Sequence, residues 1–311
     1  MPTDKLQTAP AEGAAGVTAR GETAPPGAPA LEAAYYTDPL CPWSWAFEAQ
    51  WRRLRFECGD RLTWRYVMGG MVADWRSYRD PVNAVHNPGQ MGLQCYQVRQ
   101  LTGAPLDERV WHDDPPSSSY PACLAVKAAE RQGREAGEAY LRRVREAVML
   151  AGRNVARAEV LVELAEGLAG DPSLASVFDA CRFREDLLGA DVRDAFQDDI
   201  REVGYQNISR LPTLVLRAGD GPGIVLAGYR PYENILRAVN RLAPDVSPRH
   251  GEGETDAVTY VSRWKGATEN EVAEVLGVEL PAARRLLDEA VAAGALAREV
   301  ALPGCYRVPH P

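Results

Sequence analysis

One cysteine, placed between an apolar run and an amphipathic pattern, constrains the fold of this chain more than any other feature. Residues 31–36 form a short apolar run, residues 37–40 (Thr-Asp-Pro-Leu) predict a turn, and Cys41 follows directly. From residue 43 onward, apolar side chains recur at steps of three and four, as in a helix with one buried face. Because Pro42 is favoured in the first turn of a helix, the sequence predicts a strand, a turn and a helix that begins at Cys41.

Two interpretations of Cys41 follow from this position. The unpaired N–H groups and the positive dipole end at a helix start favour a thiolate, so we expect a lowered pKa and a better nucleophile. A single cysteine in a tryptophan-rich segment is also often a small buried apolar residue. Position alone leaves both interpretations open.

Further strands are indicated on both sides of a long helical block. An aromatic and β-branched run at residues 62–68 predicts a strand parallel to the first, because a helix crosses between them. Two apolar runs, 213–217 and 224–227, are separated by an Asp-Gly-Pro-Gly turn and predict an antiparallel hairpin. A helix over residues 231–242 follows.

The segment between these strands reads as an insertion of helices. We expect a subdomain of about residues 71–205 inserted into an α/β domain of residues 31–248, because helices gathered in one block are flanked by strands. The expected helices cover residues 88–101, 120–132, 135–150, 159–168, 172–181 and 186–203.

Three stretches together resemble the DsbA family of thioredoxin-like proteins. They are residues 37–45 (Thr-Asp-Pro-Leu-Cys-Pro-Trp-Ser-Trp), residues 117–123 (Ser-Ser-Ser-Tyr-Pro-Ala-Cys) and residues 210–213 (Arg-Leu-Pro-Thr). The first stretch is similar to the cytosolic branch of this family. That branch includes FrnE-like proteins and adaptors that deliver a transcription regulator to a protease. More distant members are the kappa-class glutathione transferases and the 2-hydroxychromene-2-carboxylate isomerases. The resemblance spans about residues 31–243 and implies an α/β thioredoxin-like fold with a large helical insertion.

The resemblance also implies a site made from two distant segments. In this family the proline of the third stretch is cis and lies against the active-site cysteine, which would place Pro212 beside Cys41. From the residues alone, an X-Pro bond is cis only about one time in twenty. Leu211 would offer its backbone to an extended substrate, as an added strand does. The other side chains expected to contact substrate are Pro42, Trp43 and Thr213.

Ser44 stands where a dithiol oxidoreductase of this family has its second cysteine. A thiolate of Cys41 that attacks a disulfide forms a mixed disulfide, and Ser44 has no thiol with which to release it. We therefore expect a thiol-disulfide oxidoreductase or isomerase that works through one cysteine, with Cys41, Ser44 and Pro212 as catalytic residues. The releasing thiol would be glutathione, another low-molecular-weight thiol, or a resolving cysteine such as Cys123.

Two other functions stay open at this point. One is a non-catalytic adaptor that holds a client in the thioredoxin-like groove, which the missing second cysteine favours. The other is a glutathione-type thiol transferase or isomerase, in which Cys41 or Ser44 would orient the sulfur of the co-substrate.

Residues 256–311 resemble a small winged helix-turn-helix module, joined by a linker at residues 249–255. Thr268 and Glu271 form a capping-box pattern at the start of its first expected helix. This module carries six cationic and eight acidic side chains, and a net negative charge is unfavourable for contact with DNA phosphates. We therefore expect protein docking, or formation of a homodimer, rather than nucleic-acid binding. The expected helices and wing strands are residues 268–276, 280–293, 295–300 and 304–308.

Composition limits the remaining possibilities. The net charge of −8 argues against a general nucleic-acid partner, and no apolar run approaches the roughly eighteen residues of a membrane span. Residues 1–30 read as a disordered tail without an export signal, so we expect a cytoplasmic protein. The six cysteines are widely spaced, which predicts neither a disulfide framework nor a metal site. We expect no resident cofactor, and a protein or peptide client that carries a thiol or disulfide.

Overall fold

Five strands form one sheet in the part of the chain that the structure describes, residues 7–8, 31–246 and 256–309 of a computed structural model. Their order is β1-β5-β4-β2-β3, with β2 and β3 parallel and the other pairs antiparallel. The predicted parallel pair and hairpin are confirmed. The strands are β1 (Gln7–Thr8), β2 (Leu31–Thr37), β3 (Leu62–Met68), β4 (Thr213–Arg217) and β5 (Ile224–Ala227).

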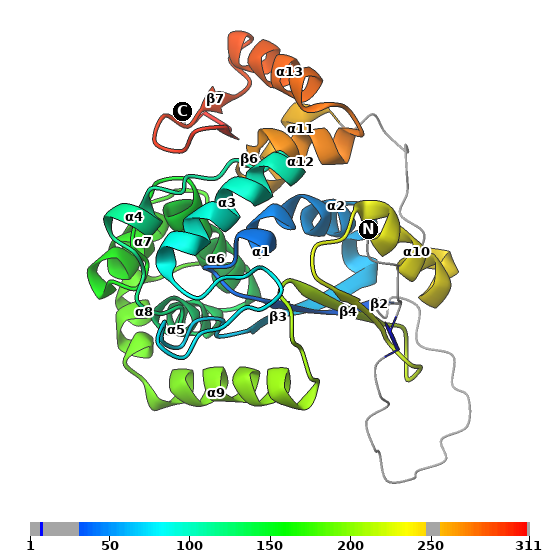
Figure 1. Cartoon of the computed structure of the whole chain (residues 1–311). Helices are drawn as coiled ribbons and strands as arrows, with labels where there is room; N and C mark the ends of the chain where they lie inside the picture. Colours follow the sequence, from blue (N-terminus) through cyan, green and yellow to red (C-terminus); the bar gives the residue numbers. More distant parts are fainter. Residues whose placement is uncertain (1–6, 9–30, 247–255, 310–311) are drawn as a thin grey trace.

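Two helices and a short 3-10 turn connect β2 to β3 (Figure 1). The sequence predicts one helix here, whereas the structure has α1 (Pro42–Ala46) and α2 (Glu48–Cys58), followed by η1 (Gly59–Arg61). Phe47 separates them but keeps helical dihedral angles (φ −74°, ψ −9°), so the helix is kinked and not ended there. After β5, the predicted C-terminal helix of this domain is α10 (Tyr232–Leu242), with η2 (Pro244–Val246) behind it.

The predicted helical insertion lies between β3 and β4. Local residues determine where helix α3 begins and ends. At its start, the Asn87 side chain accepts a hydrogen bond from the Gln90 amide and Pro88 occupies the first turn. At its end, Gly103 adopts the left-handed conformation (φ 70°). The inserted helices are α3 (Pro88–Thr102), α4 (Val110–Asp113), α5 (Tyr120–Glu130), α6 (Arg134–Met149), α7 (Ala158–Ala169), α8 (Ala180–Leu187) and α9 (Ala190–Tyr205).

Two of the predicted inserted helices are wrong in their bounds. Residues 172–177 form turns instead of a helix, and α8 begins later, where the Asp179 side chain accepts the amides of Cys181 and Arg182. An aspartate cap fixes a helix start more strongly than a proline that only tolerates one. The predicted helix 186–203 is divided because α8 ends at Leu187 and α9 begins at Ala190.

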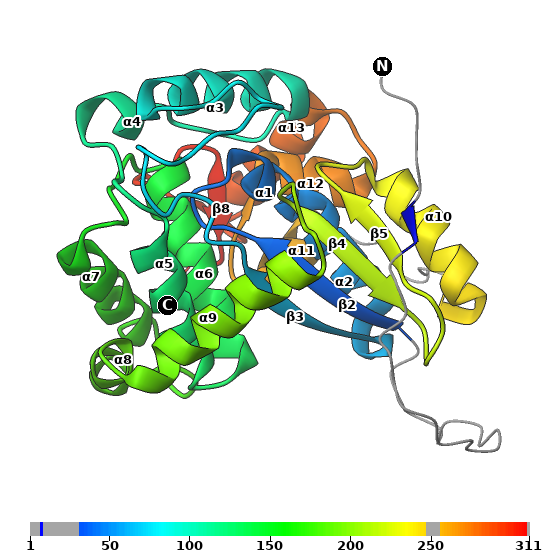
Figure 2. The same cartoon turned by 60° about the horizontal axis from the view of Figure 1, so that its bottom comes forward.

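Alternate side chains of the strands pack on opposite faces of the sheet. On one face, Tyr36 and Val215 pack with Val203 of α9, and Figure 2 shows α9 running along that face. On the other face, Tyr35 packs against Trp51 of α2, with ring centroids 5.3 Å apart. Helix α10 contacts both α2 and β4 on this second face. The sheet is therefore covered on both sides, as in an α/β domain.

Residues 256–309, called the C-terminal module below, form three helices and a small sheet of order β6-β8-β7 in the described part of the chain. The predicted capping box at Thr268 and Glu271 is present, as are the two predicted helices, and two short antiparallel strands lie within the residues predicted for the wing. The first helix and β6 were not predicted. The elements are α11 (Ala257–Trp264), β6 (Ala267–Thr268), α12 (Glu269–Leu276), α13 (Leu280–Ala292), β7 (Ala297–Arg298) and β8 (Cys305–Arg307).

The C-terminal module packs on α2 of the thioredoxin-like part (Figure 1). Phe56 of α2 joins the apolar core of the module, with its ring centroid 5.5 Å from that of Tyr260. The expected linker, residues 249–255, lies outside the described residues. So does the expected tail at residues 1–30, apart from Gln7–Thr8, which pair with β5.

Candidate active site

Cys41 lies at the mouth of α1, as its cap residue. Its backbone is extended (φ −83°, ψ 112°), and its Sγ accepts a hydrogen bond from the Ser44 amide at 3.4 Å. The thiol itself points at the Leu211 carbonyl oxygen, 3.8 Å away. These contacts bring together two segments that are 170 residues apart in the chain.

The pKa of Cys41 is raised, whereas its position at a helix start predicted a lowered pKa. Burial raises the pKa of the thiol to about 11, and the negative charge of Asp38 adds to this effect, while Ser44 beside the sulfur opposes it. The side chain is only 3% exposed. The loss of solvation of a buried thiolate therefore outweighs the favourable field at the helix start. At neutral pH Cys41 is therefore a neutral thiol.

Asp38 organises the turn before Cys41, and sequence reasoning missed this role. Its carboxylate accepts the amides of Leu40 at 2.9 Å and Met71 at 2.6 Å. Burial raises the pKa of Asp38, against the lowering effect of these hydrogen bonds. Asp-Pro pairs are common in exposed turns, so only the fully buried position in the structure identifies this aspartate as part of the site.

Cys123, the predicted resolving cysteine, lies near the start of α5 and is also buried. Its Sγ donates to the carboxylate of Asp38 at 3.5 Å. Burial, and then the charge of Asp38, raise the pKa of Cys123 well above its ordinary value. All six cysteines of the chain are free thiols in this structure. Cys123 is therefore a neutral thiol held toward Asp38, whose charge also acts on Cys41.

The Leu211–Pro212 peptide bond is cis. Gly69, at the end of β3, leaves the space in which the Leu211 side chain lies. A Cβ at position 69 would stand 2.6 Å from one methyl carbon of Leu211, closer than any allowed contact, while the Gly69 amide donates to the Thr37 carbonyl at 2.7 Å. Glycine at this position thus allows the cis-proline loop to approach the strand that leads to Cys41.

A groove of about 380 Å³, called the Cys41 groove below, lies over this junction. Trp43 lines it from α1 and is braced by Tyr229, at 5.9 Å between ring centroids. Arg79 and Arg210 also line it, which sequence reasoning missed. The residues that line the groove and carry its chemistry are Cys41, Trp43, Tyr78, Arg79, Arg210 and Leu211.

Several predicted site residues lie behind the groove instead of in its lining. The Thr213 hydroxyl donates to the Arg210 carbonyl at 2.6 Å, so it fixes the loop. The Ser44 hydroxyl is buried and finds no hydrogen-bond partner among the described residues. The predicted residues absent from the described lining are Pro42, Ser44, Cys123, Pro212 and Thr213.

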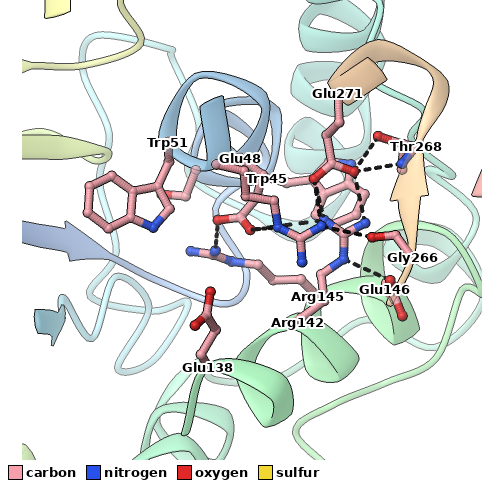
Figure 3. Close-up of polar contacts among 12 residues, drawn as sticks. Trp45, Glu48, Trp51, Glu138, Arg142, Arg145, Glu146, Gly266, Thr268 and Glu271 are labelled. Carbon is pink, nitrogen blue, oxygen red and sulfur yellow. Dashed lines mark hydrogen bonds and ion pairs between the residues drawn. The ribbon is translucent and has the colours of Figure 1, made fainter. Parts of the chain in front are cut away.

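A buried ion pair between Arg145 and Glu48 lies close to the strand that leads to Cys41 (Figure 3). The Arg145 guanidinium contacts the Glu48 carboxylate and the Thr37 hydroxyl, so it joins α6 to α2 and to the end of β2. Burial lowers the pKa of Arg145, but the charge of Glu48, together with smaller contributions from neighbouring groups, raises it overall. Sequence reasoning missed Arg145 because it lies in a helix rich in Arg and Glu, which reads as a solvated face.

Neither a metal cluster nor a membrane helix is found in the described residues. No group of three or more His, Cys, Asp or Glu side chains in residues 7–8, 31–246 and 256–309 could hold a metal ion. None of the described helices is long and apolar enough to cross a membrane.

Comparison with known proteins places this geometry in a family. Bacterial ClpXP adapter proteins named SpxH are similar in sequence: that of Halalkalibacterium halodurans is 28% identical over 270 residues, covering 84% of this chain and 83% of the relative. That of Bacillus subtilis is 29% identical over 213 residues, covering 66% of each chain.

Solved structures share the fold. A putative protein disulfide isomerase of Nitrosomonas europaea superposes with a TM-score of 0.56 at 22% identity, covering 71% of this chain and 99% of the other. A probable DsbA oxidoreductase of Streptomyces coelicolor gives a TM-score of 0.51 at 20% identity, covering 73% and 94%. A thioredoxin family model matches residues 35–237, more than half of the chain, with the groove and the cis-proline loop inside that range. The chain therefore belongs to the thioredoxin family.

Proposed function

We propose that this protein is an adaptor that holds an extended segment of a client protein in the Cys41 groove and delivers it to a ClpXP-type protease. The observation that carries the proposal is the buried, neutral Cys41, which has serine and not cysteine three residues later. A thiol with a pKa of about 11 is a poor nucleophile at neutral pH. The likeness to proteins named ClpXP adapter proteins supports the same conclusion.

The Cys41 groove offers a client both backbone and charge. Residues 208–211 line it outside any strand, so an extended chain could pair with the backbone groups of this segment that Cys41, Thr213 and Val203 do not already occupy. Arg79 donates to the carbonyls of Arg76 and Tyr78, and pairs with no carboxylate of the described residues. With Arg210 it gives the groove two cations against one lining carboxylate, Asp80, and this excess of positive charge would attract a client segment that contains Asp or Glu. Such an adaptor would work in the cytoplasm.

Gly69→Val tests the groove without touching Cys41. The added side chain forces the Leu211 methyl groups away from their present position, and this flexible side chain can shift at small cost to the fold. Protein half-lives would be measured across the proteome of source cells that lack the chain, complemented with wild type, Gly69→Val or Cys41→Ser. Thermal melting of each purified variant would verify folding.

The expected result is a set of proteins whose half-lives lengthen without the chain or without the protease. Wild type and Cys41→Ser should restore their degradation, whereas Gly69→Val should not. The adaptor function is excluded if no protein is stabilised by loss of the chain. It is also excluded if a folded Cys41→Ser variant fails as completely as the deletion, because the thiol would then be chemically required.

Thiol-disulfide exchange by one cysteine is the second candidate, favoured by the position of Cys41 in the groove wall. The Cys41 sulfur would lose its proton and bond to one sulfur of a client disulfide as the S–S bond breaks, and the other sulfur would leave and take up a proton as a thiol. A second thiol from outside, such as glutathione, would then displace Cys41. Turnover of a glutathionylated peptide by wild type, with none by Cys41→Ser, would favour this candidate over the adaptor.

A further inference from the structure

A second pocket, away from Cys41, lies where the insertion meets the C-terminal module. It has a volume of about 620 Å³, within the range of small-molecule sites, and is called the junction pocket below. Arg55 of α2, Trp64 of β3 and Arg134 of α6 line it from the thioredoxin-like part, and Arg263 and Lys265 line it from the module. Arg142 and Glu146, drawn in Figure 3, form part of its wall.

The junction pocket is cationic although the chain as a whole is acidic. Eight Arg or Lys side chains line it against four Asp or Glu, while the net charge of the chain is −8. A concave site with an excess of one sign of charge concentrates ions of the opposite sign. The composition of this pocket therefore favours an anionic ligand.

Most of these cations already have carboxylate partners in the structure. Arg52 and Arg142 share Glu271, Arg55 pairs with Glu138, and Lys265 lies 3.8 Å from Glu135. These pairs hold the pocket together instead of leaving charge for a ligand.

Arg134 and Arg263 differ from the other cations of the junction pocket. Neither pairs with a carboxylate among the described residues, and both side chains are exposed. Arg134 is held over the Trp64 ring, 5.3 Å from its centroid. Arg134 begins α6 and Arg263 lies near the end of α11, so they approach the pocket from its two different parts. Two unpaired guanidinium groups can each bind an oxyanion with two parallel hydrogen bonds.

Arg143 also has carboxylate partners, because it lies 3.6 Å from Glu146 and 3.4 Å from Asp171. Burial lowers its pKa, and these carboxylates oppose the shift. Beside the cations, the largely buried side chains of Leu168 and Leu174 make part of the pocket wall apolar.

We propose that the junction pocket binds a small organic phosphate, with its phosphate between Arg134 and Arg263 and its carbon body toward Leu168 and Leu174. A tetrahedral phosphate with two negative charges matches two guanidinium groups better than a single carboxylate does. Because the ligand would touch both α6 and the C-terminal module, its binding would hold the module against the thioredoxin-like part.

Calorimetry of the whole protein with inorganic pyrophosphate at low ionic strength tests the proposal. Wild type should bind, and the double variant Arg134→Ala/Arg263→Ala should bind at least tenfold more weakly, at a cost of about 1.4 kcal/mol. Arg285→Ala is the matched control, because Arg285 is exposed on α13 of the same module and lines no part of the pocket. This control should bind like wild type.

Thermal melting gives an independent readout. Pyrophosphate should raise the melting temperature of wild type and of Arg285→Ala but not of the folded double variant, since only binding to the native state stabilises it. The proposal is overturned if pyrophosphate does not bind, or if the double variant binds it as well as wild type. Malonate that binds as tightly as pyrophosphate would overturn the choice of phosphate over carboxylate.

Discussion

Glu271 is the residue whose loss should most weaken the attachment of the C-terminal module. Its carboxylate is fully buried and accepts hydrogen bonds from Arg142 at 2.8 and 3.0 Å, Arg52 at 3.1 Å and the Thr268 amide at 2.7 Å (Figure 3). Removing one partner of a buried ion pair costs about 3–5 kcal/mol, because the other charge stays buried.

The substitution Glu271→Gln keeps the shape and removes the charge. Arg142 would still pair with Glu146 at 2.7 Å, and Arg52 would keep Glu48 at 3.7 Å. Each arginine therefore keeps one carboxylate partner. The expected loss of stability is then at the lower end of the range of about 3–5 kcal/mol, at about 3 kcal/mol. If the module opens as a unit, this loss makes amide exchange in α12 faster by about a hundredfold.

Hydrogen exchange by mass spectrometry, at neutral pH, measures this opening. Glu289→Gln is the control, because Glu289 is exposed on α13 and makes no ion pair with any described residue; its effect should stay within about 0.5 kcal/mol. An increase of less than about fivefold in α12 exchange for Glu271→Gln, which is about 1 kcal/mol, would refute the argument that this carboxylate holds the module.

Three further predictions concern the buried titratable groups. Burial raises the pKa of Glu271, but its two arginine partners outweigh this effect and lower the pKa from 4.5 to about 2. Urea titrations should therefore show the full difference in unfolding free energy between wild type and Glu271→Gln above pH 4.5, and this difference should shrink as the pH falls toward 2. Cys41 should react with iodoacetamide more slowly than exposed Cys181, and its rate should still rise above about pH 8.5; a plateau below that pH would contradict a buried neutral thiol. Asp38→Asn should move the Cys41 alkylation profile to lower pH, since a negative neighbour is removed, and should lower the unfolding free energy by about 1–3 kcal/mol.

The strands and most helices could be predicted because their signals are local. Residues 62–68 and the hairpin at 213–227 combine apolar runs with turn residues, and Asn87 with Pro88 defines a helix start by itself. The helix expected at residues 172–181 was wrong because the decisive cap, Asp179, lay inside it. Local signals that compete within one stretch can be ranked only when the packed structure is known.

Site residues could be predicted where a local sequence motif identifies them. They could not be predicted where their role depends on a partner that is distant in the sequence. Cys41 and Leu211 follow from motifs, and the structure places them in contact. Arg145 looks like any arginine of a solvated helix until Glu48, nearly a hundred residues earlier, is placed beside it. The pKa of Cys41 was mispredicted for a similar reason, because burial depends on the insertion and the cis-proline loop, which the helix start cannot reveal.

The carboxylate of Glu271 also bears on how this architecture could have arisen. It neutralises Arg52 of α2 and Arg142 of α6, so a charge belonging to the C-terminal module balances charges that belong to the thioredoxin-like part. Cutting the gene at the linker would separate an acid from its two bases. A relative that gains or loses this module by recombination should therefore change at positions 52 and 142 as well, and the three residues should be inherited together.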